Sequence, residues 1–361
     1  MRHFYVGGCD PPFPWVGGKS FLVPVIRKCI PTDIEKYVEV FGGGGAVMFS
    51  GKIAPNEIYN DFNNHLTNLM WQMQNEPEYM ESLIMKAYGN TDRKNRIKEF
   101  CHRLFVNARD FFTINNVVFC AGNDYAKLFD QVYKILRKAE TKREKRHALW
   151  LVEKILKKFR QRQSNPEMWD AVLFYLTLKC SFSATGKSWA CKSVSADSIS
   201  TLINHAAKRL QNVAIENKDC IELIKINDKE TTFFYLDPPY FEAEDYYKDI
   251  GEFGIDKHKA LHNAILNCKG RCLVSYNDCE FIRQLYSEDK FTIIEFERPH
   301  SMALHTGAGK DVQWQHHSTF YVVLPLEVLI ANYDVKSVYM ANDVQLSLFD
   351  QGQDHTIRFC Q

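Results

Sequence analysis

Three features that would assign a chain to a common class are missing here. No hydrophobic run of the 361-residue sequence is long enough to span a bilayer, and the nearest candidate, residues 320–331, is interrupted by Pro325 and Glu327. The opening residues 1–6 contain no apolar segment of the kind that directs secretion. The eleven cysteines include no CxxC pair. We therefore expect free thiols in a reducing cytoplasm and no zinc site.

A loop for binding nucleoside triphosphates is also missing. Gly18-Lys19-Ser20 and Gly186-Lys187-Ser188 each resemble the end of a Walker A loop. That motif needs a glycine five positions before its second glycine, and those positions hold Phe13 and Ser181. The sequence therefore excludes a P-loop enzyme.

The net charge is only +1, from 45 Lys or Arg and 44 Asp or Glu, but the charges are unevenly distributed. Residues 86–162 hold 20 basic and 8 acidic side chains, so this window carries +12 and the remainder of the chain −11. A basic helical face is usually a solvated surface. Here aromatic and amide residues interleave with the charges (Phe111, Phe112, Asn115 and Asn116). The pattern favours contact with phosphates, without indicating a preferred sequence.

The pattern of short apolar runs predicts an α/β protein with a helical insertion. We expect strands at 37–41, 57–60, 233–236, 271–275, 292–296 and 320–324. Residues 66–200 show helical periodicity instead. The predicted organisation is a catalytic domain of residues 1–65 and 201–332, a helical domain at 66–200 and a polar tail at 333–361.

A strand followed by four glycines suggests a place where a cofactor can approach the backbone. The run Tyr37 to Phe41 leads into Gly42 to Gly45, and Asp61 ends the next strand, 20 residues after Phe41. A glycine turn alone is a weak signal. An acid at that offset can accept hydrogen bonds from both ribose hydroxyls of an adenosine. The alternative for Asp61 is an N-cap on the following helix.

The tetrapeptide Asp237-Pro238-Pro239-Tyr240 follows the apolar run 233–236 directly. It places a carboxylate, a rigid turn without amide donors and an aromatic face at a strand end. The amino group of adenine is a poor nucleophile because its lone pair is delocalised. Asp237 and the carbonyl of Pro238 can accept its two hydrogens, and the carboxylate stabilises the charge that grows during methyl transfer. Tyr240 can stack on a base rotated out of the duplex. The alternative is an ordinary strand-ending turn.

Together these segments resemble the Dam-type (class D12) family of DNA adenine N6-methyltransferases over about residues 12–330. Pro12 to Lys19 is similar to the family's W-x-G-G-K opening, and Glu39 to Val47 to its F-x-G-x-G turn. Tyr59 to Asn63 resembles its D-x-N, Asp237 to Tyr240 its catalytic motif, and Ser275 to Asp278 a later strand-ending motif.

The resemblance implies a Rossmann-like S-adenosylmethionine-dependent fold with an inserted, mostly helical target-recognition domain, and double-stranded DNA as substrate. It implies that the cofactor is bound by Trp15, Lys19, Phe41, Gly43, Gly45, Asp61 and Asp237. The alternatives to cofactor binding are that Trp15 packs in the core and that Lys19 is a surface charge. Asp219 is an acceptor for the cofactor's adenine amine or a helix cap.

In the same family, residues 171–176 would form the central helix of the recognition domain, and residues 182–192 would take the place of its recognition hairpin. The loop 298–310 resembles a DNA-facing loop. Pro14 stands where relatives that read GATC carry a lysine, and the hairpin differs from theirs. The target sequence therefore stays open.

A second motif lies near the C-terminus. Gln345-Leu346-Ser347-Leu348-Phe349 resembles the peptide with which bacterial replication and repair proteins bind the sliding clamp. It would make the clamp a partner and point to a bacterium or its phage. The alternative is an amphipathic segment that folds back on the protein.

The leading hypothesis is a site-specific DNA adenine N6-methyltransferase that flips its target base. A cytosine N4-methyltransferase is the nearest enzyme alternative, although those more often carry Ser at position 237. An RNA target is a further alternative, and competition between RNA and DNA substrates would distinguish the two. A hypothesis of another class is a clamp-associated DNA-binding protein with an inactive methylase frame. Failure to bind S-adenosylmethionine, alongside retained DNA binding, would support it.

Overall fold

The computed structural model describes residues 7–88, 165–180, 196–241, 253–287, 289–296, 327–346 and 357–360, with scattered residues between 138 and 154. The chain divides into two compact units, one of residues 1–27 and 35–220 and the other of residues 28–34 and 221–361. No helix in the described part of the chain is long and apolar enough to cross a membrane.

The first unit contains three parallel strands, β1 (Lys36–Glu39), β2 (Asn56–Asn60) and β3 (Val213–Glu216). β2 lies between the other two, with Val38 of β1 opposite Ile58 and Ile58 opposite Ala214 of β3. The short helices α1 (Val23–Cys29) and α2 (Ala46–Phe49) precede and follow β1. Parallel strands need crossover connections, and helices supply them here.

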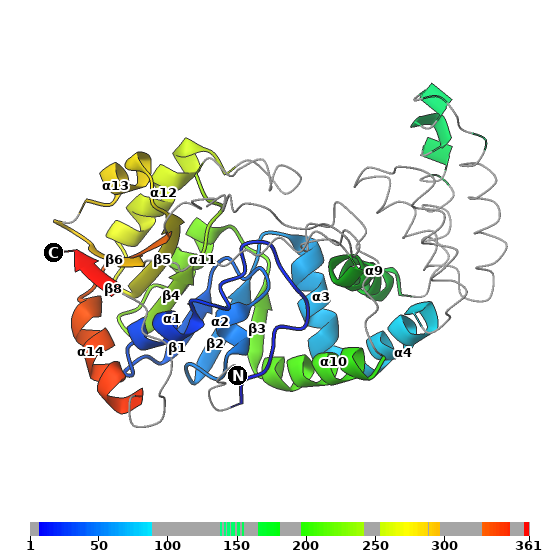
Figure 1. Ribbon diagram of the computed structural model, residues 1–361, viewed down its shortest axis with the longest axis horizontal. Helices are drawn as coiled ribbons and strands as arrows, with labels where there is room; N and C mark the ends of the chain where they lie inside the picture. The colour runs from blue at the N-terminus through cyan, green and yellow to red at the C-terminus, as the bar shows by residue number, and fades with distance from the viewer. Residues whose placement is uncertain are drawn as a thin grey trace, which may run out of the picture. The chain divides into compact units, whose positions relative to one another are not determined.

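Four longer helices of the same unit pack against one another: α3 (Asn64–Asn75), α4 (Pro77–Tyr88), α9 (Pro166–Cys180) and α10 (Ala196–Leu210). They lie together in Figure 1. Their starts follow local rules. Asn63 caps α3 by accepting from His65 N at 3.0 Å, and Asn165 Oδ1 accepts from Met168 N at 3.0 Å at the start of α9. α4 begins at a proline, whose missing N–H is not needed there.

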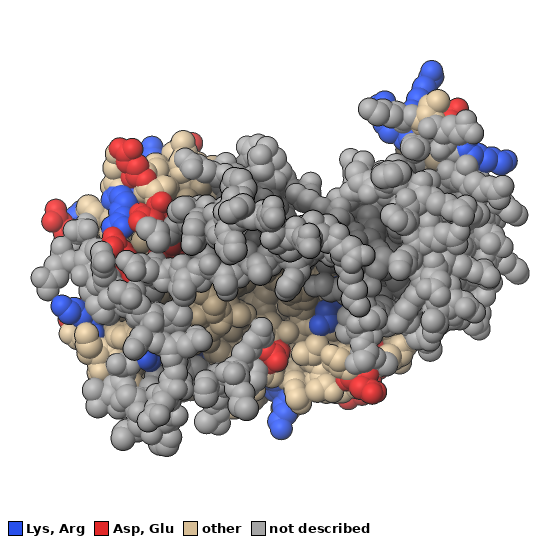
Figure 2. Space-filling view, in the orientation of Figure 1, with Lys and Arg blue, Asp and Glu red and all other residues tan. Residues whose placement is uncertain are grey.

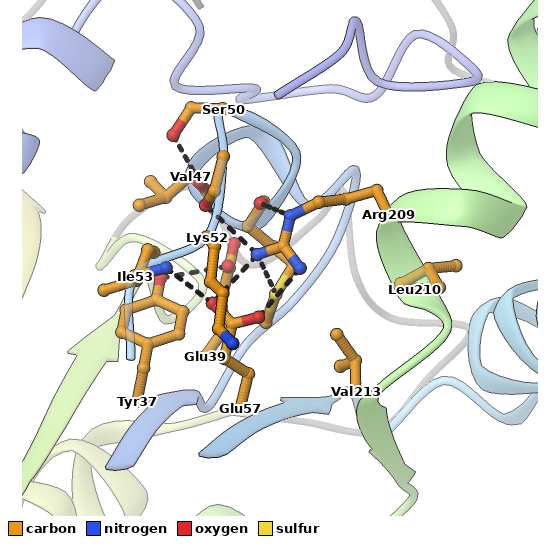
Figure 3. A network of polar contacts seen from close by, with 12 residues as sticks. Tyr37, Glu39, Val47, Ser50, Lys52, Ile53, Glu57, Arg209, Leu210 and Val213 are labelled. Carbon is orange, nitrogen blue, oxygen red and sulfur yellow. Dashed lines mark hydrogen bonds and ion pairs between the residues drawn. The ribbon is translucent and has the colours of Figure 1, made fainter. Parts of the chain in front are cut away.

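A buried ion pair connects α10 to the strands (Figure 3). The Arg209 guanidinium donates to both carboxylate oxygens of Glu57 on β2, at 2.8 and 2.9 Å. It also donates to the carbonyls of Met48 and Gly51 at 2.9 and 3.1 Å. Both side chains are 5% exposed. Arg209 therefore satisfies backbone carbonyls at the end of α2 while neutralising an acid on β2.

The second unit contains β4 (Thr232–Leu236), β5 (Arg271–Asn277), β6 (Thr292–Phe296), β7 (Glu327–Ala331) and β8 (Ile357–Cys360). β4 and β5 are parallel, whereas β7 pairs antiparallel with β5 and β6, and β8 antiparallel with β6. All of β4 is buried, which explains the apolar run that follows its first residue, Thr232. The helices are α11 (Cys220–Asn227), α12 (Ile255–Leu266), α13 (Glu280–Leu285) and α14 (Val335–Leu346).

Within the first unit the strand order is β3-β2-β1, and within the second it is β4-β5-β7-β6-β8. This mixed α/β sheet is consistent with the predicted methyltransferase fold. Five of the six predicted strands are present to within two residues, and the sixth, 320–324, lies outside the described residues. The sequence reasoning missed β3, β7 and β8. Residues 335–346 and 357–360, predicted to be part of a tail, form α14 and β8 instead.

Candidate active site

The glycine turn after β1 is bonded to the acid that follows β2. The N–H of Gly43 donates to Asp61 Oδ2 at 2.8 Å, and the N–H of Asn63 donates to Asp61 Oδ1 at 2.8 Å. Gly43 and Gly45 have φ of 48° and 67°, which glycine adopts without strain. Asn63, not Asp61, caps α3. The capping alternative for Asp61 is therefore wrong.

Close contacts explain why the turn contains several glycines. A Cβ on Gly42 would lie 2.2 Å from the Tyr59 ring, and a Cβ on Gly43 2.8 Å from Trp15 Nε1. A Cβ on Gly44 would lie 2.8 Å from Trp15 Cβ. The Tyr59 hydroxyl also donates to the Gly43 carbonyl at 2.7 Å. Trp15 on one side and Tyr59 on the other therefore fix the path of the turn.

Trp15 and Lys19 contribute the preceding segment. Trp15 is half-buried and lies edge-on to Phe13, with ring centroids 6.5 Å apart. Its ring is also 6.4 Å from that of Phe174 on α9. Lys19 is only 3% exposed, and its Nζ donates to the Gly17 carbonyl at 2.8 Å. The reading of Lys19 as a surface charge is therefore wrong.

Asn60 holds the ends of the three parallel strands together, a role that the sequence reasoning missed. Its Nδ2 donates to the Val40 carbonyl at 2.9 Å and to the Lys218 carbonyl at 3.2 Å. Its Oδ1 accepts from Lys218 N at 2.8 Å. Asn217 Nδ2 donates to the Asp61 carbonyl at 2.7 Å. These bonds fix the segment that leads to Asp219. Asp219 directly precedes α11, a position compatible with both predicted roles, an acceptor for the cofactor's adenine amine and a helix cap.

The electrostatics of Asp61 suit a hydroxyl ligand. Burial raises the pKa of its carboxyl to about 6, against the hydrogen bonds from Asn63 and Gly43, which lower it. The group is therefore mostly ionised at neutral pH. Each carboxylate oxygen already accepts one backbone N–H and keeps capacity for a further donor. Two adjacent hydroxyls, as in a ribose, match that capacity.

Two aromatic residues flank this acid and the turn. Phe41, the residue predicted to lie against the cofactor's adenine, is half-buried where β1 gives way to the turn. Phe62 follows Asp61 and is 60% exposed. Phe62 was not among the predicted site residues, although an apolar residue beside an acid at a strand end is a recognisable signal. An exposed ring there offers a face to a planar ligand.

The second constellation surrounds the Asp-Pro-Pro-Tyr turn after β4. Asp237 Oδ1 lies 3.3 Å from Ser275 Oγ on β5, which is buried and is also 2.9 Å from the Tyr235 hydroxyl. The Leu236 carbonyl lies 3.4 Å from the same Oγ. A chain of donors from Tyr235 through Ser275 to Asp237 uses each hydroxyl proton once. The neighbouring strand thereby orients the carboxylate.

Tyr240 is fixed at its hydroxyl, which donates to Glu327 Oε1 at 3.1 Å. Burial, and then the charges of Asp237 and Glu327, raise the pKa of Tyr240 well above its ordinary value, so the hydroxyl stays protonated as a donor. Its ring lies at 40° to that of Tyr276, with centroids 6.4 Å apart. Pro238 is buried and Pro239 half-buried.

The structure thus assembles Trp15, Gly43, Gly45, Asp61 and their supports in the first unit, and Asp237 to Tyr240 with theirs in the second. Among the described residues no group of histidine, cysteine and acidic side chains could hold a metal ion. The described cysteines are free thiols (Cys9, Cys29, Cys220, Cys268, Cys272 and Cys279).

Of the basic window, the structure describes residues 86–88 at the end of α4 and scattered residues between 138 and 154. The described charged side chains between residues 138 and 154 are mostly basic and exposed (Lys138, Arg143, Glu144, Arg146 and Lys154). Among the coloured atoms at the upper right of Figure 2, blue Lys and Arg side chains predominate over red Asp and Glu. Lys154 Nζ lies 3.8 Å from the centre of the Trp150 ring, which is 47% exposed. The predicted central helix at 171–176 falls within α9. The residues 111–116, the hairpin 182–192 and the loop 298–310 lie outside the described residues.

Comparison with known proteins identifies the family of this chain. A model of the D12 class N6 adenine-specific DNA methyltransferase family matches residues 15–302. Type II methyltransferase M1.LlaDCHI of Lactococcus lactis subsp. cremoris is 37% identical over 97 residues, which are 27% of this chain and 32% of that relative. Type II methyltransferase M.CviBI of Paramecium bursaria Chlorella virus NC1A is 22% identical over 314 residues, 85% of this chain and 97% of that relative.

The first of these alignments thus spans about a third of the relative's length, and the second nearly all of it. The family match includes every residue predicted for the site, from Trp15 to Tyr240, and covers well over half of the chain. The chain belongs to the D12 class of N6 adenine-specific DNA methyltransferases.

Proposed function

We propose that the protein transfers a methyl group from S-adenosylmethionine to N6 of an adenine rotated out of duplex DNA. The observation that carries this proposal is the turn after β4, where Ser275 orients the carboxylate of Asp237. In an adenine-specific family, that carboxylate would accept an N–H of the target amine, because the amine must be held with its lone pair directed at the methyl group.

The cofactor half of the proposal rests on the first unit. Asp61, with free acceptor capacity on both oxygens, would bind the ribose hydroxyls. The turn at Gly43 and Gly45 would let the ligand approach the backbone, with Trp15 behind it. Phe41 and Phe62 would offer apolar faces to the adenine, and Lys19 would hold the Gly17 segment next to Trp15. S-Adenosylmethionine supplies a methyl group on a positively charged sulfur when bound.

The base half rests on the second unit. Asp237 would accept one N–H of the target amine and the Pro238 carbonyl the other. As N6 takes the methyl group from the sulfur, positive charge would appear on N6 until the amine releases one of its two protons. The carboxylate stabilises that charge more than it stabilises the neutral amine. Tyr240 would stack on the base, which offsets part of the unstacking cost of a few kcal/mol.

Binding of the duplex is assigned to the basic window, residues 86–162, within a target-recognition domain at 66–200. Its excess of 12 positive charges supports phosphate contact and predicts strong salt dependence. Both relatives are named Type II methyltransferases, and we propose the same modification role for this chain.

The sliding clamp stays a proposed partner through residues 345–349. Gln345 and Leu346 form the last turn of α14, and the remaining three residues lie outside the described part of the chain. Binding in an extended form would require that last turn to unwind. Co-migration with purified clamp, lost on deletion of residues 345–349, is the expected result; unchanged co-migration contradicts it.

The proposed activity is tested by tritium transfer from labelled S-adenosylmethionine to unmethylated duplex DNA. The wild type should transfer label, and Asp237→Ala should not. Asp33→Asn provides a matched control, because it removes a carboxylate that is 72% exposed and outside both constellations. Undiminished transfer by the Asp237 variant would refute the proposed role of the turn.

A further inference from the structure

Glu327 lies beside the catalytic turn but beyond the segment that the family model covers. It is the first residue of β7, whereas the family match ends at residue 302. Its Oε1 accepts the Tyr240 hydroxyl at 3.1 Å, across 87 residues of sequence. Strand pairing explains the contact: Glu327 stands opposite Asn277 at the end of β5, in the antiparallel register of these two strands.

Residues of β5 contact the turn at both of its ends, and a residue of β7 contacts it in between. Ser275 contacts Asp237 at the start of the turn, and Asn277 Nδ2 donates to the Phe241 carbonyl at 3.2 Å just after it. Between these points Glu327 holds the tip of Tyr240. A tyrosine ring has two side-chain torsions, and a bond at its far end restricts both. The ring plane is therefore set by Glu327 and by the tilted contact with Tyr276.

The surroundings of Glu327 speak against a purely structural carboxylate. Its Oε2 is buried and has no hydrogen-bond partner among the residues that the structure describes, and the same holds for Asn277 Oδ1. A buried acceptor without a donor costs stability. An apolar residue at the start of β7 would avoid that cost. The one bond that the carboxylate makes to another described side chain is the bond to Tyr240.

We infer that Glu327 is a positioning residue for methyl transfer, holding the Tyr240 ring in the plane that receives the target base. This inference rests on the proposed stacking role of Tyr240. A hydrogen bond from a protonated phenol to a carboxylate is among the stronger kinds, so its loss should be visible in kcat. S-Adenosylmethionine binding, which is assigned to other residues, should not change.

The test is a double-mutant cycle on methyl transfer, with Glu327→Ala, Tyr240→Phe and the double variant. Each single variant should lower kcat about tenfold, because each removes one hydrogen bond to a charged group. The double variant should be no slower than either single variant, within about twofold. Glu327→Gln should retain a third or more of the wild-type kcat, because its amide oxygen can still accept. The dissociation constant of S-adenosylmethionine, measured by calorimetry, should stay within about twofold throughout.

Two results would overturn the inference. One is an effect of Glu327→Ala that is equally large in the Tyr240→Phe background, and the other is wild-type kcat in Tyr240→Phe. The second result can be obtained even if Glu327→Ala does not fold, because Tyr240→Phe keeps the ring and its packing. Both outcomes presuppose methyl transfer by the wild type, so they are distinct from failure of the proposed function, in which the wild type transfers no label.

Discussion

Removing the Arg209 side chain should destabilise the first unit severely. Arg209→Met deletes the two bonds to Glu57 and those to the carbonyls of Met48 and Gly51, and it leaves Glu57 buried at 5% exposure. The remaining bond to that carboxylate comes from Ile53 N at 2.8 Å. Breaking a buried pair from one side typically costs about 3–5 kcal/mol.

The assay is urea unfolding followed by circular dichroism at neutral pH. Asp33→Asn is the matched control, because it breaks an ion pair with Arg271 at 2.7 Å in which Asp33 is 72% exposed. We expect that control to lose less than about 1 kcal/mol. The double variant Arg209→Met with Glu57→Met should recover part of the loss, since no charge is then left buried without a partner.

A loss of unfolding free energy in Arg209→Met no larger than that in Asp33→Asn would contradict this prediction. It also fails if the double variant loses the sum of the two single losses, because the penalty would then not come from an orphaned charge.

Three further predictions concern the glycine turn, its acid and a buried histidine. Gly43→Ala should weaken S-adenosylmethionine binding at least tenfold by calorimetry, since its Cβ would meet Trp15 Nε1 at 2.8 Å with φ at +48°; Gly254→Ala, with no heavy atom within 4 Å in the described structure, should bind normally. Binding to the wild type should weaken as pH falls through about 6, where Asp61 takes up a proton, and equal affinity at pH 5 and 7.5 would contradict its role. Burial lowers the pKa of His258 to about 4 from 6.5, so the neutral ring stabilises the fold above 6.5 and this contribution is lost as pH falls toward 4. In urea unfolding at a series of pH values, His258→Gln should lose less unfolding free energy between pH 6.5 and 4 than the wild type does. An unchanged pH dependence would contradict the assignment.

Most strands and the main candidate site residues were predicted from local sequence. β4 could be predicted because a strand buried on both faces needs an unbroken apolar run, and its end is marked by two prolines after an acid. The glycine turn and Asp61 could be predicted from their spacing, and the structure joins them by the bond from Gly43 N. β3 has the same length as β1 but was missed, because only one of its four residues is buried and it therefore lacks a clear apolar run.

The supporting contacts could not be predicted, because they depend on strand pairing. Ser275 reaches Asp237 across 38 residues, and Glu327 reaches Tyr240 across 87. No periodicity in the sequence records which strand ends lie opposite each other. Burial of Lys19 was missed for a related reason: a lysine at 3% exposure has the same local sequence as one on the surface.

The central claim is that the turn from Asp237 to Tyr240 directs a methyl group from S-adenosylmethionine to the amine of adenine. Mass spectrometry of nucleosides tests it most directly, after unmethylated DNA is treated with the protein and cofactor carrying a deuterated methyl group. The account predicts labelled N6-methyladenine with the wild type and none with Asp237→Ala. Label in N4-methylcytosine, or equal N6-methyladenine from the variant, would contradict it.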